Sequence, residues 1–225
     1  MKNVTRKRIA FLIPIVTVAI LLTITGVYFH QSFLKILPLY ISLFVMTLSA
    51  NVSRYALLVG GVNSVLYAMI YFSYQLYGMA AYALFISFPI QMISFILWKK
   101  HAYRQSVTLK KLTAKQRLVV VSGFLVAWFV LYIALRKSGA SYALLDNTVT
   151  LFGVLISVLQ MLAYIEYTYL MIPNGLATCA LYIQMLFKSP EQMTYLVFSM
   201  YSLVCVVRQY INAKKLYQIQ NSEGL

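Results

Sequence analysis

Long runs of apolar residues, separated by short polar connections, occupy most of the chain. A membrane-spanning α-helix needs ~20 consecutive, mostly apolar residues, and eight stretches come close to that length. The pattern therefore predicts eight transmembrane helices, at residues 9–29, 33–50, 55–76, 78–98, 118–135, 143–164, 168–187 and 193–211.

The first apolar run follows a basic N-terminus, as the apolar region of a signal peptide does. It is too long for such a region, however, and it lacks a clear small-residue cleavage site. We therefore expect residues 1–32 to contain a retained N-terminal transmembrane helix.

Composition agrees with this interpretation. Hydrophobic residues make up 62% of the 225 residues and charged residues 10%, and the mean hydropathy is +0.79. A soluble domain is typically ~45–50% apolar and ~25% charged, so both a soluble globular protein and a disordered chain are excluded. The predicted fold class is an all-α polytopic membrane protein.

The net charge is +15, and the basic residues lie between the apolar runs. Because this is the usual distribution of Lys and Arg in a membrane protein, we reject nucleic acid as a partner. Lys and Arg collect in cytoplasmic segments, where anionic lipids are their natural partners. With the N-terminus inside, fifteen of the nineteen Lys and Arg residues face the cytoplasm, seven of them in the connection 99–117. This count predicts that both termini are cytoplasmic.

The third and seventh runs share a pattern in which a Tyr follows an Asn by eight residues. The pairs are Asn63 with Tyr71 and Asn174 with Tyr182, and eight residues is about two helical turns, which puts each pair on one face. Three predicted helices surround each pair, and one helix links the two triplets, so both triplets have the same orientation. The sequence therefore predicts a parallel repeat, with a division into 1–32 (N-terminal helix), 33–98 (first repeat), 99–142 (basic cytoplasmic loop and linker helix), 143–212 (second repeat) and 213–225 (cytoplasmic tail).

The two asparagines lie mid-helix, where a buried amide is costly without a partner. They are either contacts between helices or a pair of amides that face a central substrate. Pro173, directly before Asn174, either breaks its helix at a binding site or is an ordinary tolerated proline.

Nineteen tyrosines give a second kind of candidate, because aromatic faces stack planar rings and attract cations. Five are expected in the interfacial belt: Tyr28, Tyr77, Tyr82, Tyr142 and Tyr217. With the two asparagines, the remaining candidates for a substrate site are Tyr67, Tyr71, Gln91, Gln160, Tyr167 and Tyr182, each of which could instead pack between helices.

Catalytic and metal chemistry find no support in the sequence. Asp146 and Glu166 bracket the sixth run and are expected at helix ends, Asp146 as a cap or dipole partner, which weakens a proton-coupled mechanism. His30 and His101 are isolated, and neither cysteine suggests a disulfide or a metal site. We therefore predict no enzyme activity, no catalytic residues, no metal and no cofactor.

Several of these segments are similar to the nicotinamide riboside transporter family, also called the PnuC family. The likeness covers 51–98 and 143–212 and rests on Gly61 to Asn63, Gln75 to Tyr77, Trp98, Leu144 to Asp146, Tyr164 to Glu166 with Asn174, and Arg208 with Tyr210 to Asn212. The chain departs from the family where a Trp-x-x-Trp pair is replaced by Tyr167 and Leu170, and where Gln91 and Ile93 to Phe95 stand in the fourth span.

The resemblance implies two three-helix units joined by a linker helix, as in SWEET sugar transporters, a homotrimer, and a bacterial inner (cytoplasmic) membrane. It implies uptake of nicotinamide riboside or a related vitamin precursor or nucleoside by facilitated diffusion, with trapping by phosphorylation inside the cell. Because the tryptophans are replaced, thiamine, riboflavin and deoxynucleosides remain alternatives. A non-transporting assembly partner or sensor that uses the basic 99–117 connection is the alternative of a different class.

Overall fold

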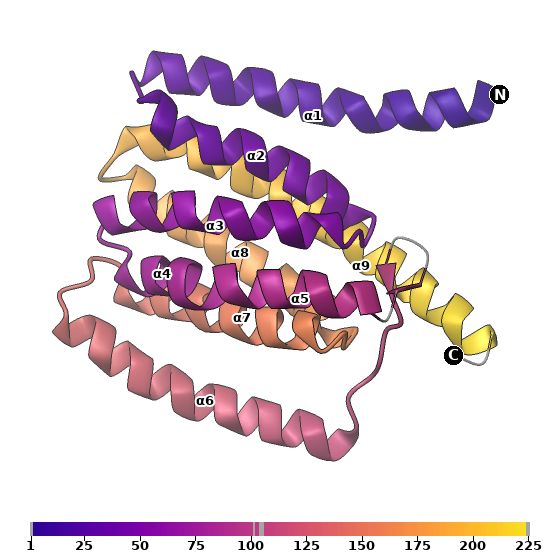
Figure 1. Cartoon of the computed structure of the whole chain (residues 1–225). Coiled ribbons are helices and arrows are strands. Elements are labelled where there is room, and N and C mark those ends of the chain that lie inside the picture. The colour runs from indigo at the N-terminus through magenta and orange to yellow at the C-terminus, as the bar shows by residue number, and fades with distance from the viewer. Residues whose placement is uncertain (1, 101, 104–105, 224–225) are drawn as a thin grey trace.

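A computed structural model describes residues 2–100, 102–103 and 106–223, with side chains from Pro14 onward except at residue 102. These residues form a bundle of long helices that run back and forth along one axis, with both ends of the chain at the same end of the bundle (Figure 1). In chain order the α-helices are α1 (Lys2–Tyr28), α2 (Phe33–Ala50), α3 (Tyr55–Ser73), α4 (Tyr77–Ala81), α5 (Phe88–Lys100), α6 (Ala114–Lys137), α7 (Ala143–Met161), α8 (Glu166–Leu186) and α9 (Met193–Ser222).

Seven helical segments of the described chain are long and apolar enough to cross a membrane, which confirms a multi-pass helical membrane protein. The third of them, the fourth of the predicted spans, combines α4, a π-helical turn and α5 into one span, Tyr77–Lys100. The apolar described part of α1, Pro14–Tyr28, is shorter than a full span, so the predicted first crossing stays a prediction.

The predicted boundaries agree with the helices to within a few residues, except at the start of the first, where α1 already begins at Lys2 rather than at residue 9, and at the end of the last. The eighth run was expected to end at 211 and to leave a tail at 213–225. The helix α9 continues to Ser222, and Ala213 and Gln220 are buried against neighbouring segments, so the residues assigned to the tail are helical as far as 222. Residues 224 and 225 lie outside the described part.

The ends of α2 and α7 have the same unusual backbone. Val52 and Ala163 both have positive φ, 54° and 59°, a conformation that costs energy for residues other than glycine. They are 111 positions apart, the same separation as Asn63 and Asn174. Each is followed by a residue whose N–H donates to the carbonyl five residues back, at 3.1 and 2.9 Å. The helices α1 and α3 end in the same way, at His30 and Gln75, so this ending is common to several helices of the bundle.

The prolines do not break their helices. Pro173 lies inside an uninterrupted α8, and Pro38 lies inside α2, so the hypothesis of a broken helix at Pro173 is wrong. The irregularity is instead the π-helical turn Tyr82–Ser87, which ends two residues before Pro89. Such turns are rare and often occur at functional sites.

The basic connection predicted at 99–117 is not an open loop in its described part. It begins with two-residue strands, β1 (Ala102–Tyr103) and β2 (Ser106–Val107), that pair antiparallel. Residues 106–113, called the strap below, then lead into α6. Arg104, one of the seven basic residues counted here, lies outside the described residues.

Backbone hydrogen bonds hold the strap against the bundle. Lys110 donates its N–H to the Ala163 carbonyl at 2.8 Å, and its own carbonyl accepts from the Ile165 N–H at 2.9 Å. Gln220, near the end of α9, accepts from one strap N–H at 2.9 Å and donates to one strap carbonyl at 3.0 Å. The strap is therefore part of the folded structure.

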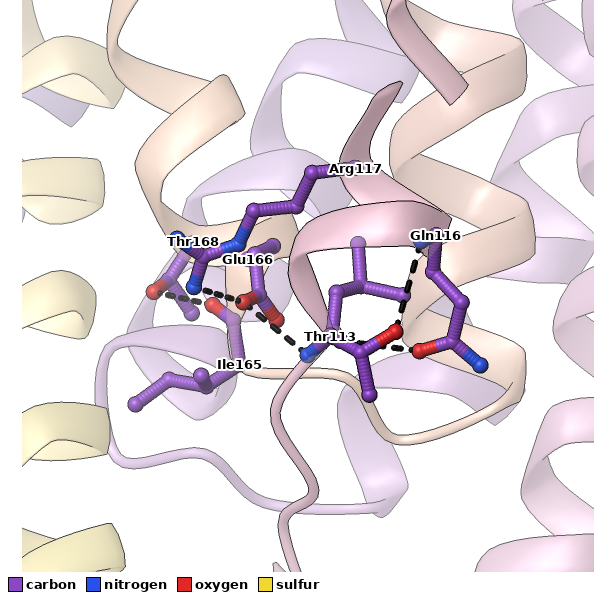
Figure 2. A network of polar contacts seen from close by, with 7 residues as sticks. Thr113, Gln116, Arg117, Ile165, Glu166 and Thr168 are labelled. Carbon is purple, nitrogen blue, oxygen red and sulfur yellow. Dashed lines mark hydrogen bonds and ion pairs between the residues drawn. The ribbon is translucent and has the colours of Figure 1, made fainter. Parts of the chain in front are cut away.

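Glu166 joins the strap to the linker helix (Figure 2). Its Oε1 accepts from the Leu112 N–H at 3.1 Å and from Arg117 Nη2 at 2.9 Å. Directly after Leu112, Thr113 and Gln116 form a reciprocal capping box at the start of α6. This arrangement gives hydrogen-bond acceptors to two backbone N–H groups that have no partner within the helix.

Candidate functional site

A cavity of about 290 Å³ lies between the two predicted triplets, lined by residues of α2, α3, the π-helical turn, α5, α7, α8 and α9. An apolar cluster packs toward each end of it. One cluster includes Leu39, Ile70 and Tyr195, and the other includes Trp98 and the buried strap side chains Val107, Leu109 and Leu112. Seven of the eight predicted site residues line this cavity: Asn63, Tyr67, Tyr71, Gln91, Gln160, Asn174 and Tyr182.

Asn63 is held tightly between α2 and α3. Its Nδ2 donates to the Pro38 carbonyl at 3.0 Å and to Ser42 Oγ at 2.8 Å. Its Oδ1 is buried and has no hydrogen-bond partner. Since a buried acceptor normally finds a donor, this oxygen is a candidate contact for a ligand.

Asn174, on α8, has a buried Oδ1 without a partner as well. The side chain follows Pro173 and precedes Gly175, which also lines the cavity. A Cβ on Gly175 would lie 2.9 Å from the Leu203 side chain, so glycine lets α8 and α9 approach closely here. The helix thus presents the amide from a continuous, closely packed wall.

Tyrosines supply most of the aromatic surface. Tyr67 and Tyr71, one turn apart on α3, have stacked rings with centroids 5.4 Å apart. Tyr182 stacks on Tyr195 at 5.6 Å, and Tyr195 belongs to the apolar cluster at that end. The rings are therefore fixed by their neighbours, which suits the binding of a planar ring.

The two glutamines occupy different surroundings. Gln91 donates through Nε2 to Ser87 Oγ at 2.6 Å and to Ser64 Oγ at 3.2 Å, so it combines a cavity position with contacts between helices. The Gln160 side chain lines the cavity, and its backbone carbonyl accepts from Trp98 Nε1 at 2.9 Å.

Tyr167 does not line the cavity. It is completely buried, its ring lies 6.5 Å from that of Trp98, and its hydroxyl accepts from Gln209 Nε2 at 3.3 Å. It lies in the apolar cluster that contains the strap side chains, so its proposed role in the wall of the site is corrected.

Tyr82, in contrast, was not predicted in the site but belongs to it. Expected in the interfacial belt, it lines the cavity from the π-helical turn, and its hydroxyl shares a hydrogen bond with Ser157 Oγ at 2.8 Å. A Cβ on Gly153 would lie 2.8 Å from the Tyr82 ring, so a glycine one turn from Ser157 makes room for it.

Asp146 performs a capping role, but for another helix than its own. Its carboxylate accepts from the N–H groups of Gly78 and Met79 at 3.1 and 3.0 Å, at the start of α4, and from Thr150 Oγ1 at 3.4 Å. The group is fully buried and does not line the cavity.

The cavity lining carries no formal charge among the described residues, since none of its side chains is Asp, Glu, Lys, Arg or His. Within the part of the chain that the structure describes, no group of three or more His, Cys, Asp or Glu residues could hold a metal ion. The site therefore offers amide and hydroxyl hydrogen bonds together with aromatic faces.

Comparison with known proteins agrees with this picture. The family described as nicotinamide mononucleotide transporter matches residues 32–212. The nicotinamide riboside transporter PnuC of Neisseria mucosa is 30% identical over 173 residues, which are 74% of this chain but only 65% of that protein. The crystal structure of the vitamin B3 transporter PnuC superposes with a TM-score of 0.80 at 25% identity, covering 94% of this chain and 91% of that one. Because the family match extends over residues 32–212, the chain belongs to the nicotinamide mononucleotide transporter family, and the predicted relationship to PnuC is confirmed.

Proposed function

We propose that this protein takes up nicotinamide riboside, or a closely related vitamin precursor or nucleoside, across the membrane. The observation that carries the proposal is the central cavity, which combines two unpartnered asparagine oxygens with four tyrosines and no charged side chain among its described lining residues. Ribose hydroxyls and a carboxamide supply the donors that Asn63 and Asn174 lack.

The tyrosines suit the charged ring of such a substrate. The pyridinium ring of nicotinamide riboside is planar and cationic, and the faces of aromatic side chains attract cations. Tyr67, Tyr71, Tyr82 and Tyr182 all line the cavity. The same argument accommodates thiamine, whose ring is also cationic, and the stacking surface accommodates riboflavin or a deoxynucleoside.

The absence of cationic side chains from the described lining favours a phosphate-free substrate. A mononucleotide would bring a phosphate into a space where no Lys or Arg meets it, and a buried charge without a partner costs far more than a buried hydroxyl. This argument favours the riboside over the mononucleotide.

The proposed mechanism is facilitated diffusion. Asp146 is occupied by two backbone N–H groups, and no acid lines the cavity in its described part, so no proton carrier is required. Phosphorylation in the cytoplasm would trap the substrate, because the phosphorylated product no longer fits an uncharged cavity.

The architecture we propose is a pair of parallel three-helix units, 33–98 and 143–212, joined by α6 and preceded by α1. The two units place Asn63 and Tyr71, and Asn174 and Tyr182, around one cavity, which supports it. We further propose that both termini are cytoplasmic in a bacterial inner membrane, that basic connections contact anionic lipids, and that three copies assemble as a homotrimer, the last on family resemblance.

The alternative of a non-transporting sensor or assembly partner is less well supported. It relied on the basic connection as a loop free to contact another protein, whereas three buried apolar side chains fix the strap to the bundle, although Lys110 and Lys111 stay exposed. Deleting the connection would damage the fold and test neither function.

Uptake into liposomes tests the proposal. Purified protein is reconstituted, the liposomes are preloaded with unlabelled nicotinamide riboside, and entry of labelled riboside is followed. We expect counterflow with the riboside, none with the mononucleotide, and no accumulation driven by a proton gradient. Failure with the whole panel of riboside, thiamine, riboflavin and deoxynucleosides would reject the transport function.

A further inference from the structure

Ser42, on α2, connects the two polar side chains of α3 that line the cavity nearest to it. Asn63 Nδ2 donates to Ser42 Oγ at 2.8 Å, and Ser42 Oγ donates to the Tyr67 hydroxyl at 2.9 Å. Ser42 itself is buried and lines the cavity. The three side chains form one hydrogen-bond chain between α2 and α3.

The direction of this chain is set by its first member. Both hydrogens of the Asn63 amide are used, one by Ser42 and one by the Pro38 carbonyl at 3.0 Å. Turning the amide over would place its oxygen against the Pro38 carbonyl, two acceptors facing each other, so the assignment is fixed by the network. Asn63 can therefore only accept from a ligand, through its unpartnered Oδ1.

The last member is fixed in the opposite sense. Because the Tyr67 hydroxyl accepts from Ser42, its own hydrogen points away from Ser42 and is available as a donor. This wall of the cavity thus presents one acceptor, Asn63 Oδ1, and one donor, the Tyr67 hydroxyl, one helical turn apart.

The second half of the chain lacks the equivalent of this device. The position 111 residues after Ser42 is Gly153, which has no side chain and instead makes room for the Tyr82 ring. Asn174 is thus not oriented in the way that Asn63 is, although both lie in corresponding places in α8 and α3. The two faces of the cavity therefore differ in their hydrogen-bonding groups, just as the base and the ribose of a nucleoside do.

We propose that Ser42 is a positioning residue that holds Asn63 as a fixed acceptor and Tyr67 as a donor, and so selects substrates with a hydrogen-bond donor at this wall. The inference rests on the proposed function, and a primary carboxamide or a ribose hydroxyl is the group it selects. Ser42 acts through its two neighbours and is not itself required to touch the substrate.

The test compares nicotinamide riboside with analogues that keep its cationic ring and each lack one hydrogen-bond donor group. These are 3-acetylpyridine riboside, in which an acetyl group replaces the carboxamide, and the 2′-, 3′- and 5′-deoxy ribosides. Binding to the purified full-length protein is measured by calorimetry. For the wild type we expect at least one analogue to bind about tenfold more weakly, because the Asn63 oxygen is left without a donor.

In Ser42→Ala that ratio should fall at least about threefold, since only the Pro38 carbonyl still orients the amide. Ser42→Thr keeps the hydroxyl and should keep the ratio, and Ser42→Cys tests the hydrogen bond at nearly unchanged volume if the alanine variant folds poorly. Ser122→Ala, on the exposed face of α6, is the matched control. A merely structural Ser42 would lower affinity for all ligands alike and leave the ratio unchanged.

The outcomes separate this inference from the proposed function. If the wild type binds nicotinamide riboside but no analogue is discriminated, or if Ser42→Ala and Ser42→Cys bind with the wild-type ratio, the role of Ser42 is refuted and the transporter proposal stands. If the wild type binds none of these ribosides, the proposed substrate fails, and the inference about Ser42 fails with it.

Discussion

The carboxylate of Asp146 accepts a hydrogen bond from the backbone N–H of Gly78 at 3.1 Å, although the two residues are 68 positions apart. The contact joins the first turn of α7 to the first turn of α4, and so ties the two predicted triplets together. A negative charge at a helix N-terminus satisfies orphan N–H groups and complements the helix dipole. This buried acid is therefore part of the scaffold around the cavity.

Gly78 should not tolerate a side chain. A Cβ there would lie 2.9 Å from Thr150 Oγ1 and 3.1 Å from both Asp146 oxygens, so Gly78→Ala should lower the free energy of unfolding by about 1–3 kcal/mol. Thermal unfolding in detergent measures this. In the control, Gly123→Ala on α6, the new Cβ meets nothing within 4 Å and should be neutral or stabilising by about 0.5–1 kcal/mol. Equal effects of the two substitutions would contradict the close approach at Gly78.

Asp146→Asn tests whether this acid carries protons. The amide oxygen keeps an acceptor for one of the two α4 N–H groups, its nitrogen cannot accept from the other, and the side chain cannot release a proton. We expect the variant to transport the substrate into liposomes with the same lack of response to a pH gradient as the wild type. Facilitated diffusion would be overturned if a proton gradient drove accumulation of substrate by the wild type and Asp146→Asn abolished that accumulation.

Asn174→Ala should weaken substrate binding without unfolding the protein. It removes one of the two unpartnered cavity oxygens, and a lost hydrogen bond to substrate corresponds to about 1 kcal/mol, or roughly fivefold in affinity. The measurement is the KM for uptake, with Asn221→Ala at the exposed end of α9 as control. Normal uptake by Asn174→Ala at wild-type KM would remove this residue from the site.

Much of the site could be predicted because helical spacing determines a face. Asn63 with Tyr71, and Asn174 with Tyr182, share faces by their eight-residue spacing, and the structure places all four on the cavity. Tyr167 shares that face with Asn174 as well, but it lies seven residues earlier, about 10.5 Å along the helix axis. Spacing gives the face and not the depth of the cavity, and for this reason Tyr167 was misplaced.

Two other features depend on contacts that no local pattern reveals. The π-helical turn shifts the rotation of the fourth span, which turns Tyr82 toward the cavity. The strap is fixed by partners in α8 and at the end of α9, Glu166 and Gln220, which are 54 and 111 residues away from the strap groups they bind. Charge composition correctly marked the connection as basic but could not show that its apolar residues are buried.

Glu166→Ala should loosen the strap. The ion pair with the half-exposed Arg117 contributes at most about 1 kcal/mol, but the substitution also leaves the buried Leu112 N–H without an acceptor, which costs about 1–3 kcal/mol. Glu166→Gln keeps an acceptor and should lose less stability. Thermal unfolding and limited proteolysis within the strap measure the effect, with Lys111→Ala, an exposed strap residue, as control. If glutamine is as harmful as alanine, the ion pair and not the backbone contact is the important interaction.

Ligand-dependent thermal stabilisation of the purified protein tests the central claim most directly. A ligand present at 100 times its Kd should stabilise the folded state by roughly 2.7 kcal/mol. We predict such a shift with nicotinamide riboside or another phosphate-free member of the panel, and no shift with nicotinamide mononucleotide. At the same ligand concentration the shift in Asn174→Ala should fall to about 1.8 kcal/mol, as a fivefold loss of affinity implies. Stabilisation by the mononucleotide equal to that by the riboside, or no shift with any ligand, would contradict an uncharged cavity built for a phosphate-free substrate.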